Sequence, residues 1–172
     1  MKLILINGPT GIGKSTISKK IHKEHPMSFL LDIDAQRRYI SGYRENRKES
    51  LRLVLAVSVA IADEHLASGH DVIIDRVFVD SEVTDRFVKL GEKRNADFLE
   101  FILNTDKETL MKRAQERGFN DGSMLTIEKV GKFWEQTQLY IENRPKAVVV
   151  ETGKKSIDEV YDLIRNKSNL LK

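Results

Sequence analysis

The residues best suited to chemistry lie near the start of the chain, where glycines, one lysine and one serine occur at a fixed spacing. Residues 8–15 read Gly-Pro-Thr-Gly-Ile-Gly-Lys-Ser, a Gly-x-x-x-x-Gly-Lys-Ser pattern between an apolar run and a segment with helical spacing. Backbone N–H groups can surround a polyphosphate only where the main chain curls tightly, and Gly8, Gly11 and Gly13 give it that freedom. The pattern therefore predicts a loop that binds the phosphates of ATP or GTP.

Each polar side chain of this loop has an expected role on the triphosphate. Lys14 would reach the β- and γ-phosphates, Ser15 would offer its hydroxyl to Mg²⁺, and Thr16 would add a hydroxyl near the α-phosphate. The first turn of the following helix would direct its unpaired N–H groups at the anion. The predicted nucleotide-binding residues of this stretch are Gly8, Pro9, Thr10, Gly11, Ile12, Gly13, Lys14, Ser15 and Thr16.

Three carboxylates follow apolar runs that read as strands. Asp32 and Asp34 are two residues apart, so they face the same side of an extended segment, and Asp75 follows the apolar run 72–74. In an open parallel sheet, ligands bind beyond the carboxyl ends of the strands, where these groups would meet the glycine-rich loop. We predict that Asp34 is the general base for an acceptor hydroxyl, that Asp32 holds Mg²⁺ through water, and that Asp75 lies on the magnesium side. A purely structural role for Asp32 or Asp34 is to cap the short helix that begins near Ala35.

Basic residues lie next to these carboxylates. Arg76 would neutralise a phosphate or an anionic acceptor, or simply pair with Asp75 or Asp80. Residues 37–52 carry six arginines and lysines with two tyrosines between them, a segment able to hold a phosphate, carboxylate or nucleotide acceptor, although we expect at least half of these cations on a solvated face. The candidate acceptor-binding residues are Asp34, Arg37, Arg38, Asp75 and Arg76.

Two further arginines precede a glycine-bearing loop. Arg113 and Arg117 are four residues apart, so they share one helix face just before residues 118–122. A loop of this kind can close over ATP and bring guanidinium groups to the transferring phosphoryl group. The structural alternative is a solvated face, because Lys112 and Glu116 are charged as well.

Length and composition narrow the class of protein. The 172 residues are 40% hydrophobic and 32% charged, so we expect one domain over residues 1–172 with a substantial core. The net charge of +3 is too small to imply nucleic-acid binding, and a chain without cysteine has no disulfide and no thiol nucleophile. The initial apolar run is too short for a signal-peptide core, and the stretch 51–62 is interrupted by Arg52 and Ser58. We expect a cytoplasmic protein without membrane contact.

The elements that must position these residues alternate along the chain. Apolar runs at 2–6, 28–31, 71–74, 98–103 and 147–150 are typical of buried parallel strands. Helical spacing covers 14–25, 51–66, 82–93, 105–117, 126–141 and 156–166, and a short helix would end near 41. Capping boxes are expected at 105–108 and 156–159, a cap at Thr126, a buried helix at 51–66 and Trp134 in the core. The alternation predicts an α/β fold with a parallel sheet covered on both faces.

With these residues, the chain resembles the small P-loop kinases, the group of shikimate, gluconate, nucleotide and polynucleotide kinases and chloramphenicol phosphotransferase. The similarity runs from residues 8–16 to Arg113 and Arg117, which precede a short lid, and to Thr152-Gly153 after the fifth strand. It implies the three-layer P-loop NTPase fold, a five-stranded sheet in the order 2-3-1-4-5, and a lid at about 113–125 that closes during transfer. It also implies ATP and Mg²⁺, with Arg113, Thr152 and Gly153 among the nucleotide-binding residues.

Within that group the acceptor is left open. Asp32-Ile33-Asp34 is similar to the Asp-x-Asp of shikimate kinases, where the second Asp meets the acceptor hydroxyl. The segment 75–78, Asp-Arg-Val-Phe, stands where those enzymes carry Gly-Gly and is closer to chloramphenicol phosphotransferase. The pattern from Asp34 to Arg37 is similar to the Asp-x-x-Arg of nucleotide and polynucleotide kinases.

The leading hypothesis is an ATP-dependent kinase that transfers the γ-phosphate to the hydroxyl group of a small-molecule acceptor. Its predicted catalytic residues are Lys14, Asp34, Arg113 and Arg117, and its predicted metal ligands are Ser15, Asp32 and Asp75. The alternative is a nucleotide, nucleoside or polynucleotide 5′-hydroxyl kinase, the one reading that involves nucleic acid, with the acceptor phosphate held by Arg37, Arg38 and Arg76. A third reading, a non-catalytic nucleotide-binding module, lacks support because the paired Asn-Lys-x-Asp and Asp-x-x-Gly motifs of guanine switches are missing. The oligomeric state is not predicted.

Overall fold

The computed structural model describes residues 1–118 and 126–168, and within them five parallel strands form one sheet in the order β2-β3-β1-β4-β5. This is the strand order that the resemblance to P-loop kinases implies, so the predicted fold class is confirmed. The strands are β1 (Lys2–Asn7), β2 (Phe29–Asp32), β3 (Val72–Asp75), β4 (Asp97–Asn104) and β5 (Val148–Glu151). The helices are α1 (Lys14–Glu24), α2 (Ile33–Arg37), α3 (Arg47–Ala67), α4 (Ser81–Arg94), α5 (Lys107–Arg117), α6 (Ile127–Glu142) and α7 (Ile157–Ser168).

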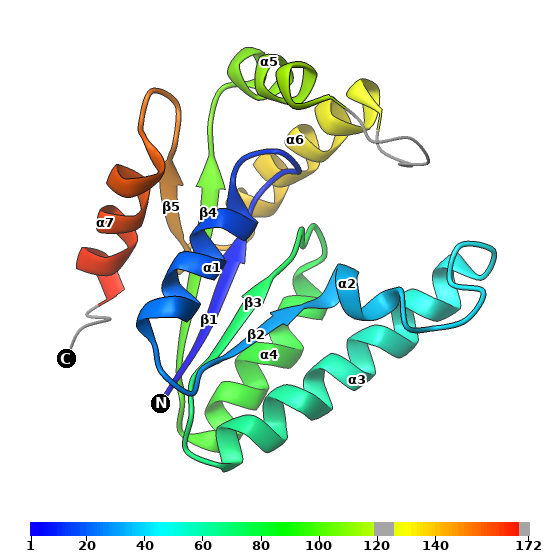
Figure 1. The fold of residues 1–172 in the computed structure, drawn as a ribbon, viewed down its shortest axis with the longest axis vertical. Helices are drawn as coiled ribbons and strands as arrows, with labels where there is room; N and C mark the ends of the chain where they lie inside the picture. The colour runs from blue at the N-terminus through cyan, green and yellow to red at the C-terminus, as the bar shows by residue number, and fades with distance from the viewer. Residues whose placement is uncertain (119–125, 169–172) are drawn as a thin grey trace.

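Alternation along the central strand divides the interior into two cores. On β1, Ile4 and Ile6 pack on the side of α1 and α7, whereas Leu3 and Leu5 pack on the side of α3 and α4. All four side chains are fully buried, because each face of the sheet is covered by helices. Figure 1 shows the resulting three layers, with the connection from β1 to α1 at the edge where the strands end.

The caps test three details of the sequence reading. Thr126 accepts a hydrogen bond from Lys129 N at the start of α6, and Ser156 and Glu159 form the reciprocal capping box of α7, as expected. The predicted cap at 105–108 is wrong by one residue. Asp106 accepts from Thr109 N, while Thr105 is buried and its carbonyl accepts from Trp134. Trp134 packs on the core, as predicted.

Helix α3 differs most from its prediction. It begins at Arg47 rather than at 51, and it is not largely buried, since Leu53 is 38% and Val57 52% exposed. The helix covers the sheet with one side only, and its apolar outer side faces away from α2, α4 and β2. The short helix predicted to end near 41 is also shorter, because α2 ends at Arg37.

Two predictions fall partly outside the described residues. The glycine-bearing loop expected at 118–122, apart from Gly118, and most of the lid expected at 113–125 lie in the segment 119–125, which the structure does not describe. In the ranges 1–118 and 126–168, none of the helices combines the length and hydropathy needed to cross a membrane.

Candidate active site

The glycine-rich loop connects β1 to α1 and is held close to the neighbouring strand. Gly8 has φ +136°, and a Cβ atom on it would lie 2.5 Å from the carbonyl oxygen of Leu103 in β4. Gly13, with φ +105°, occupies the cap position of α1. Lys14 follows it, and its side chain is buried and donates to the carbonyl oxygen of Pro9 at 3.0 Å. The loop is therefore closed on itself around the lysine, with the amino end of α1 at its mouth.

The carboxyl end of β3 brings a buried carboxylate to the first turn of α1. The Ser15 hydroxyl donates a hydrogen bond to Asp75, which is 7% exposed. Burial raises the pKa of Asp75, while the bond from Ser15 and the charge of Lys14 oppose that shift. In the sheet register Asp75 is the partner of Asp32 on β2, so two carboxylates occupy adjacent strand ends.

This donor set fits Mg²⁺. A hydroxyl and one or two carboxylates are hard oxygen ligands of the kind that Mg²⁺ takes together with substrate phosphates and water. Among the described residues no three His, Asp or Glu side chains cluster as a metal site. One oxygen of Asp32 accepts from Ala35 N at 2.9 Å, so this residue caps α2 and has its second oxygen left for a water ligand.

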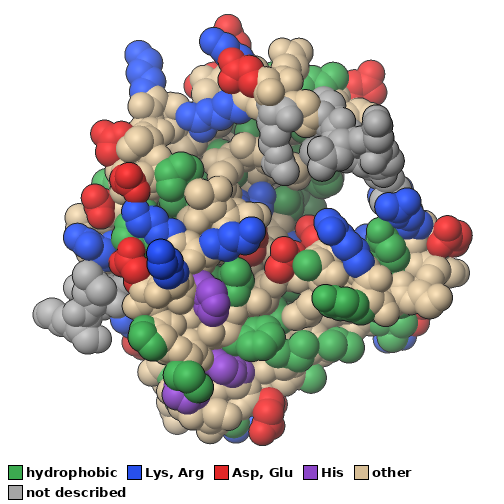
Figure 2. Space-filling view, viewed as in Figure 1, with side chains coloured by type: hydrophobic (Ala, Val, Ile, Leu, Met, Phe, Trp, Pro, Cys, Tyr) green, Lys and Arg blue, Asp and Glu red, His purple; other side chains and the backbone are tan. Residues whose placement is uncertain are grey.

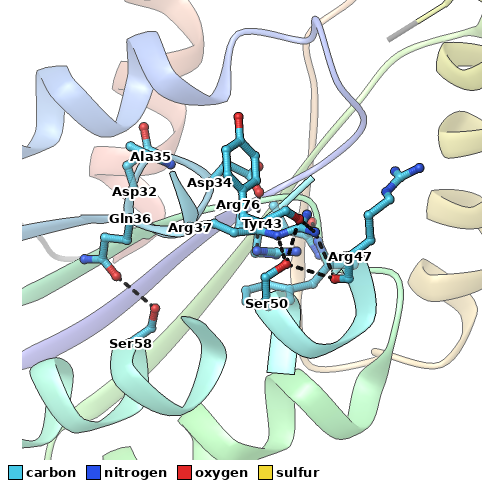
Figure 3. Close-up of polar contacts among 12 residues, drawn as sticks. Asp32, Asp34, Ala35, Gln36, Arg37, Tyr43, Arg47, Ser50, Ser58 and Arg76 are labelled. Atoms are coloured by element: carbon cyan, nitrogen blue, oxygen red, sulfur yellow. Dashed lines mark hydrogen bonds and ion pairs between the residues drawn. The ribbon is translucent and has the colours of Figure 1, made fainter. Parts of the chain in front are cut away.

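Asp34, two residues after Asp32, faces an arginine. Asp34 Oδ1 lies 3.3 Å from Nη1 of Arg76, and the Asp34 side chain is 61% exposed whereas that of Arg76 is 12% exposed. The Arg76 guanidinium lies 5.8 Å from the centre of the Phe78 ring. The pair therefore combines an accessible carboxylate with a largely buried cation, and Figure 3 shows the two side chains.

One cavity of about 510 Å³ joins these groups. Figure 2 shows acidic and basic side chains gathered around the hollow on this face of the molecule. The cavity is lined by the phosphate-loop residues and by the ends of β2 and β3, namely Thr10, Gly11, Gly13, Lys14, Ser15, Thr16, Asp32, Asp34, Arg38, Asp75, Arg76 and Val77. Residues far apart in the sequence that we predicted as one site thus share one cavity.

A larger cavity of about 770 Å³ lies elsewhere, beside the first half of β4. Its buried carboxylate, Glu100, accepts hydrogen bonds from Tyr140 at 2.6 Å and from Arg144 at 2.7 Å and 2.9 Å. Arg144 also donates to Asp85. These groups satisfy one another, and the described residues that line the cavity include neither the phosphate loop nor the carboxyl end of a strand.

Arg37 does not line the 510 Å³ cavity. Its Nε donates to the Ser50 hydroxyl at 3.0 Å, and its Nη2 donates to the carbonyl oxygens of Tyr43 at 3.2 Å and Arg47 at 2.8 Å (Figure 3). These bonds hold the turns between α2 and α3 against the start of α3. Arg38, the next residue, does line the cavity.

The remaining predicted nucleotide contacts come together on the other side of the loop. Arg113 on α5 donates to the Thr152 hydroxyl at 3.3 Å and to the carbonyl oxygens of Thr152 and Gly153. A Cβ atom on Gly13 would lie 3.4 Å from Ile157, so the connection from β5 to α7 lies beside the phosphate loop. Arg117 is the last residue of α5, and its side chain lies outside the described residues.

The sequence reading missed Asn7, the last residue of β1. Its side chain is fully buried and makes three hydrogen bonds, one with Gly8 and two with Phe78. The available signal was a polar residue at the end of a run of buried apolar residues, directly before the first glycine.

Solved structures with the same fold include one resistance protein and two kinases. The tunicamycin resistance protein of Deinococcus radiodurans matches with a TM-score of 0.66 and 13% identity, over 98% of this chain and 96% of that one. A gluconokinase from Sinorhizobium meliloti matches with a TM-score of 0.61 and 18% identity, over 95% of this chain and 89% of that one. The deoxyadenosine kinase of M. mycoides matches with a TM-score of 0.60 and 17% identity, over 99% of this chain and 100% of that one.

Comparison by sequence finds one family but no individual curated relative. Curated protein sequences yield no match. A family model does match, over residues 3–138, which include the phosphate loop, the Asp34–Arg76 pair and Arg113. Together with the confirmed strand order, this match makes the chain a P-loop kinase-like protein of the AAA_33 family, described as an AAA domain.

Proposed function

We propose that the protein is an ATP-dependent kinase that transfers the γ-phosphate to the hydroxyl group of a small-molecule acceptor. The observation that carries the proposal is the single cavity into which the phosphate loop, Asp75 and the Asp34–Arg76 pair all open. A donor phosphate and an acceptor hydroxyl bound there would meet without any large rearrangement of the sheet. Most of the catalysis of phosphoryl transfer is positioning and charge stabilisation, and such a cavity provides both.

On the donor side, the loop N–H groups and Lys14 bind the β- and γ-phosphates. The Ser15 hydroxyl and the Asp75 carboxylate would hold Mg²⁺, with Asp32 acting through water, and the ion would neutralise charge on the phosphates. Lys14 donates to Pro9 O and Ser15 donates to Asp75, so both donor groups lie at the phosphate loop.

On the acceptor side, Asp34 is the proposed general base. Its side chain is accessible, so an acceptor hydroxyl can donate to it directly. As the hydroxyl oxygen attacks the γ-phosphorus, the proton passes to Asp34 and the bond from the γ-phosphorus to the bridging oxygen of ADP breaks. Arg76 holds the carboxylate from one side at 3.3 Å, which leaves the other side for the acceptor.

The cations around the cavity suggest an acceptor with a negative group as well as a hydroxyl. Arg38 and Arg76 both line the cavity, so an acceptor bound there lies beside two guanidinium groups. Arg37 does not contact the acceptor in this proposal. Its hydrogen bonds to Tyr43, Arg47 and Ser50 instead hold the segment that follows Arg38 in place.

The same cations support a second candidate, a nucleotide, nucleoside or polynucleotide 5′-hydroxyl kinase. Arg38 and Arg76 lie where they could bind an acceptor phosphate, and the deoxyadenosine kinase of M. mycoides has the same fold. A nucleotide or polynucleotide kinase would prefer phosphate-bearing acceptors to neutral ones by a large factor, whereas a nucleoside kinase or another small-molecule kinase need not show that preference.

The proposal also assigns roles to the predicted nucleotide-contacting and lid residues outside the phosphate loop. Arg113, Thr152 and Gly153 are proposed to contact the nucleotide, because their cluster lies beside the phosphate loop. Arg113 and Arg117 are proposed to stabilise charge on the transferring phosphoryl group. We further propose that residues 1–172 act as one catalytic domain.

The proposal is tested by incubating the protein with Mg²⁺ and γ-labelled ATP against separate acceptor classes. The panel contains hydroxylated metabolites and sugar acids, nucleosides, nucleotides, 5′-hydroxyl oligonucleotides and hydroxylated antibiotics. We expect one class to receive label and Lys14→Ala to transfer none. Label transfer only to nucleosides, nucleotides or oligonucleotides would replace the leading proposal by the second, and nucleotide binding without transfer to any class would contradict both.

A further inference from the structure

Asn7 joins the phosphate loop to the segment that carries Arg76. Its Oδ1 accepts from Gly8 N at 2.7 Å and from Phe78 N at 2.9 Å, and its Nδ2 donates to Phe78 O at 3.0 Å. The side chain of Asn7 is fully buried and Phe78 is 3% exposed. A single amide group therefore satisfies one main-chain group of the phosphate loop and both main-chain groups of Phe78, without help from water.

The position of this amide follows from the sheet. The paired register of β1 and β3 ends at Ile6 and Asp75, after which the two chains separate. The Asn7 side chain bridges the gap by presenting an acceptor and a donor to Phe78, as the peptide group of a neighbouring strand would. Between the last paired residue and this bridge lie only Arg76 and Val77, and both line the active-site cavity.

The segment that bears Arg76 is thus held at both ends. Asp75 is held by the ladder with β1, and Phe78 is held by Asn7 and also packs on Phe87 with ring centres 5.9 Å apart. Arg76 in turn contacts the Phe78 ring and lies 3.3 Å from Asp34. Displacement of Phe78 would therefore shift the Arg76 guanidinium and remove its support from Asp34.

We propose that Asn7 is a positioning residue, which sets Arg76 and Asp34 relative to the phosphate loop and couples nucleotide binding at the loop to the acceptor side of the cavity. The coupling is direct, because the same Oδ1 atom accepts from Gly8 and from Phe78. Movement of the loop main chain on phosphate binding is transmitted to residues 76–78 through one side chain. The kinetic part of this inference rests on the proposed function, and the coupling itself does not.

The test uses Asn7→Ala, which removes all three bonds, and Asn7→Asp, which keeps the two that Oδ1 accepts. The matched control is Asn104→Ala at the end of the neighbouring strand β4. Asn104 also makes side-chain hydrogen bonds, to Glu151 and Gln138, but none to the phosphate loop or to residues 75–78. All measurements are made well below the unfolding midpoint of each variant. If Asn7→Ala does not fold, Asn7→Ser replaces it, because the shorter serine side chain cannot bridge Gly8 and Phe78, whereas Asn7→Asp is expected to keep the coupling.

The first readout is amide hydrogen exchange with and without MgATP. We expect MgATP to slow exchange at residues 76–78 in the wild type and in Asn104→Ala, and to leave it unchanged in Asn7→Ala, although that variant still binds nucleotide. Equal protection in Asn7→Ala and the wild type would overturn the coupling. This readout needs no acceptor, so it decides the inference even if the kinase proposal fails.

The second readout is the kinetic split between acceptor and nucleotide. Because a displacement of about 1 Å at a reacting group costs about 100-fold in rate, we expect kcat/KM for the acceptor to fall by about 10- to 100-fold in Asn7→Ala. The Kd for MgATP should change by less than about 5-fold, since Lys14, Ser15 and most loop N–H groups remain in place. Equal losses for nucleotide and acceptor, or losses no larger than those of Asn104→Ala, would refute a positioning role while leaving the kinase proposal intact.

Discussion

Replacement of Asp34 by Asn separates the proposed chemistry from the structural role of this residue. The change keeps the size of the side chain and removes its negative charge and its ability to accept the hydroxyl proton. A general base typically contributes about 10²- to 10⁴-fold to the rate. We therefore expect kcat to fall by at least about 100-fold, which corresponds to about 2.7 kcal/mol of transition-state stabilisation.

The structure indicates that stability cannot account for a loss of that size. Asp34 is 61% exposed and its one described ion pair, with Arg76, spans 3.3 Å. A pair at such a solvent-exposed carboxylate contributes about 1 kcal/mol or less to the free energy of unfolding. For a chain of this length that amounts to a fall of about 2–4 °C in the unfolding midpoint, so the variant stays folded at the assay temperature.

The assay measures transfer of labelled γ-phosphate to the acceptor identified by the screen, with the Kd for MgATP from calorimetry and the midpoint from thermal unfolding. The control is Asp63→Asn, which removes another carboxylate, 25% exposed, that pairs with two cations, Lys93 and Arg94, away from the cavity. We expect Asp34→Asn to bind MgATP normally and to transfer phosphate slowly, and the control to do both normally. Normal turnover in Asp34→Asn would remove this residue from the mechanism, and loss of MgATP binding would assign it to the donor side.

Three further predictions concern the loop and the charges. Lys14→Ala should weaken MgATP binding by at least about 10-fold in calorimetry, because charge-assisted contacts to phosphate are lost; unchanged affinity would contradict the loop's role. Gly8→Ala should lower the unfolding midpoint or prevent folding, since its Cβ would lie 2.5 Å from Leu103 O at φ +136°, whereas Gly131→Ala, with its nearest contact at 3.5 Å, should be tolerated. The pKa of Asp63 is lowered to about 2 from 3.8, chiefly by hydrogen bonds from two neighbouring cations, so its stabilising effect is present above about pH 4 and is lost as the pH falls towards 2. Wild type and Asp63→Asn should therefore differ in unfolding midpoint at pH 6 and converge near pH 2, and parallel curves would refute that linkage.

The sequence was most informative where one local pattern had one physical solution. The Gly-x-x-x-x-Gly-Lys-Ser spacing located the phosphate loop, and apolar runs located the strands, because parallel strands are buried on both faces. Polar residues after two such runs, Asp34 and Arg76, line the same cavity as the loop, since the carboxyl ends of parallel strands share one edge. These conclusions needed only local patterns and the rules of sheet topology.

It was least informative where the outcome depended on a distant partner. Arg37 follows a nucleotide-kinase pattern, yet its donors are used by Tyr43, Arg47 and Ser50, which no short pattern reveals. The apolar composition of α3 does not indicate which side lacks a covering element, so the helix was wrongly expected to be largely buried, and Val57 is 52% exposed.

The role of Asn7 could not be predicted from the sequence either, because it also depends on a distant partner. An asparagine at the end of a strand has many ordinary roles, and its bonds to Phe78 join residues 71 positions apart. Only the separation of β1 and β3 in space explains why a side-chain amide is needed at this point.

The central claim, that a phosphate bound by the glycine-rich loop is passed to a hydroxyl held at Asp34, is tested most directly by following the label itself. The protein is incubated with Mg²⁺ and γ-labelled ATP in a metabolite extract, and the labelled products are separated and identified by mass. The account predicts a new phosphate monoester that is absent with Lys14→Ala and strongly reduced with Asp34→Asn. Label found only in unreacted ATP or in inorganic phosphate, from a protein that binds MgATP, would contradict it.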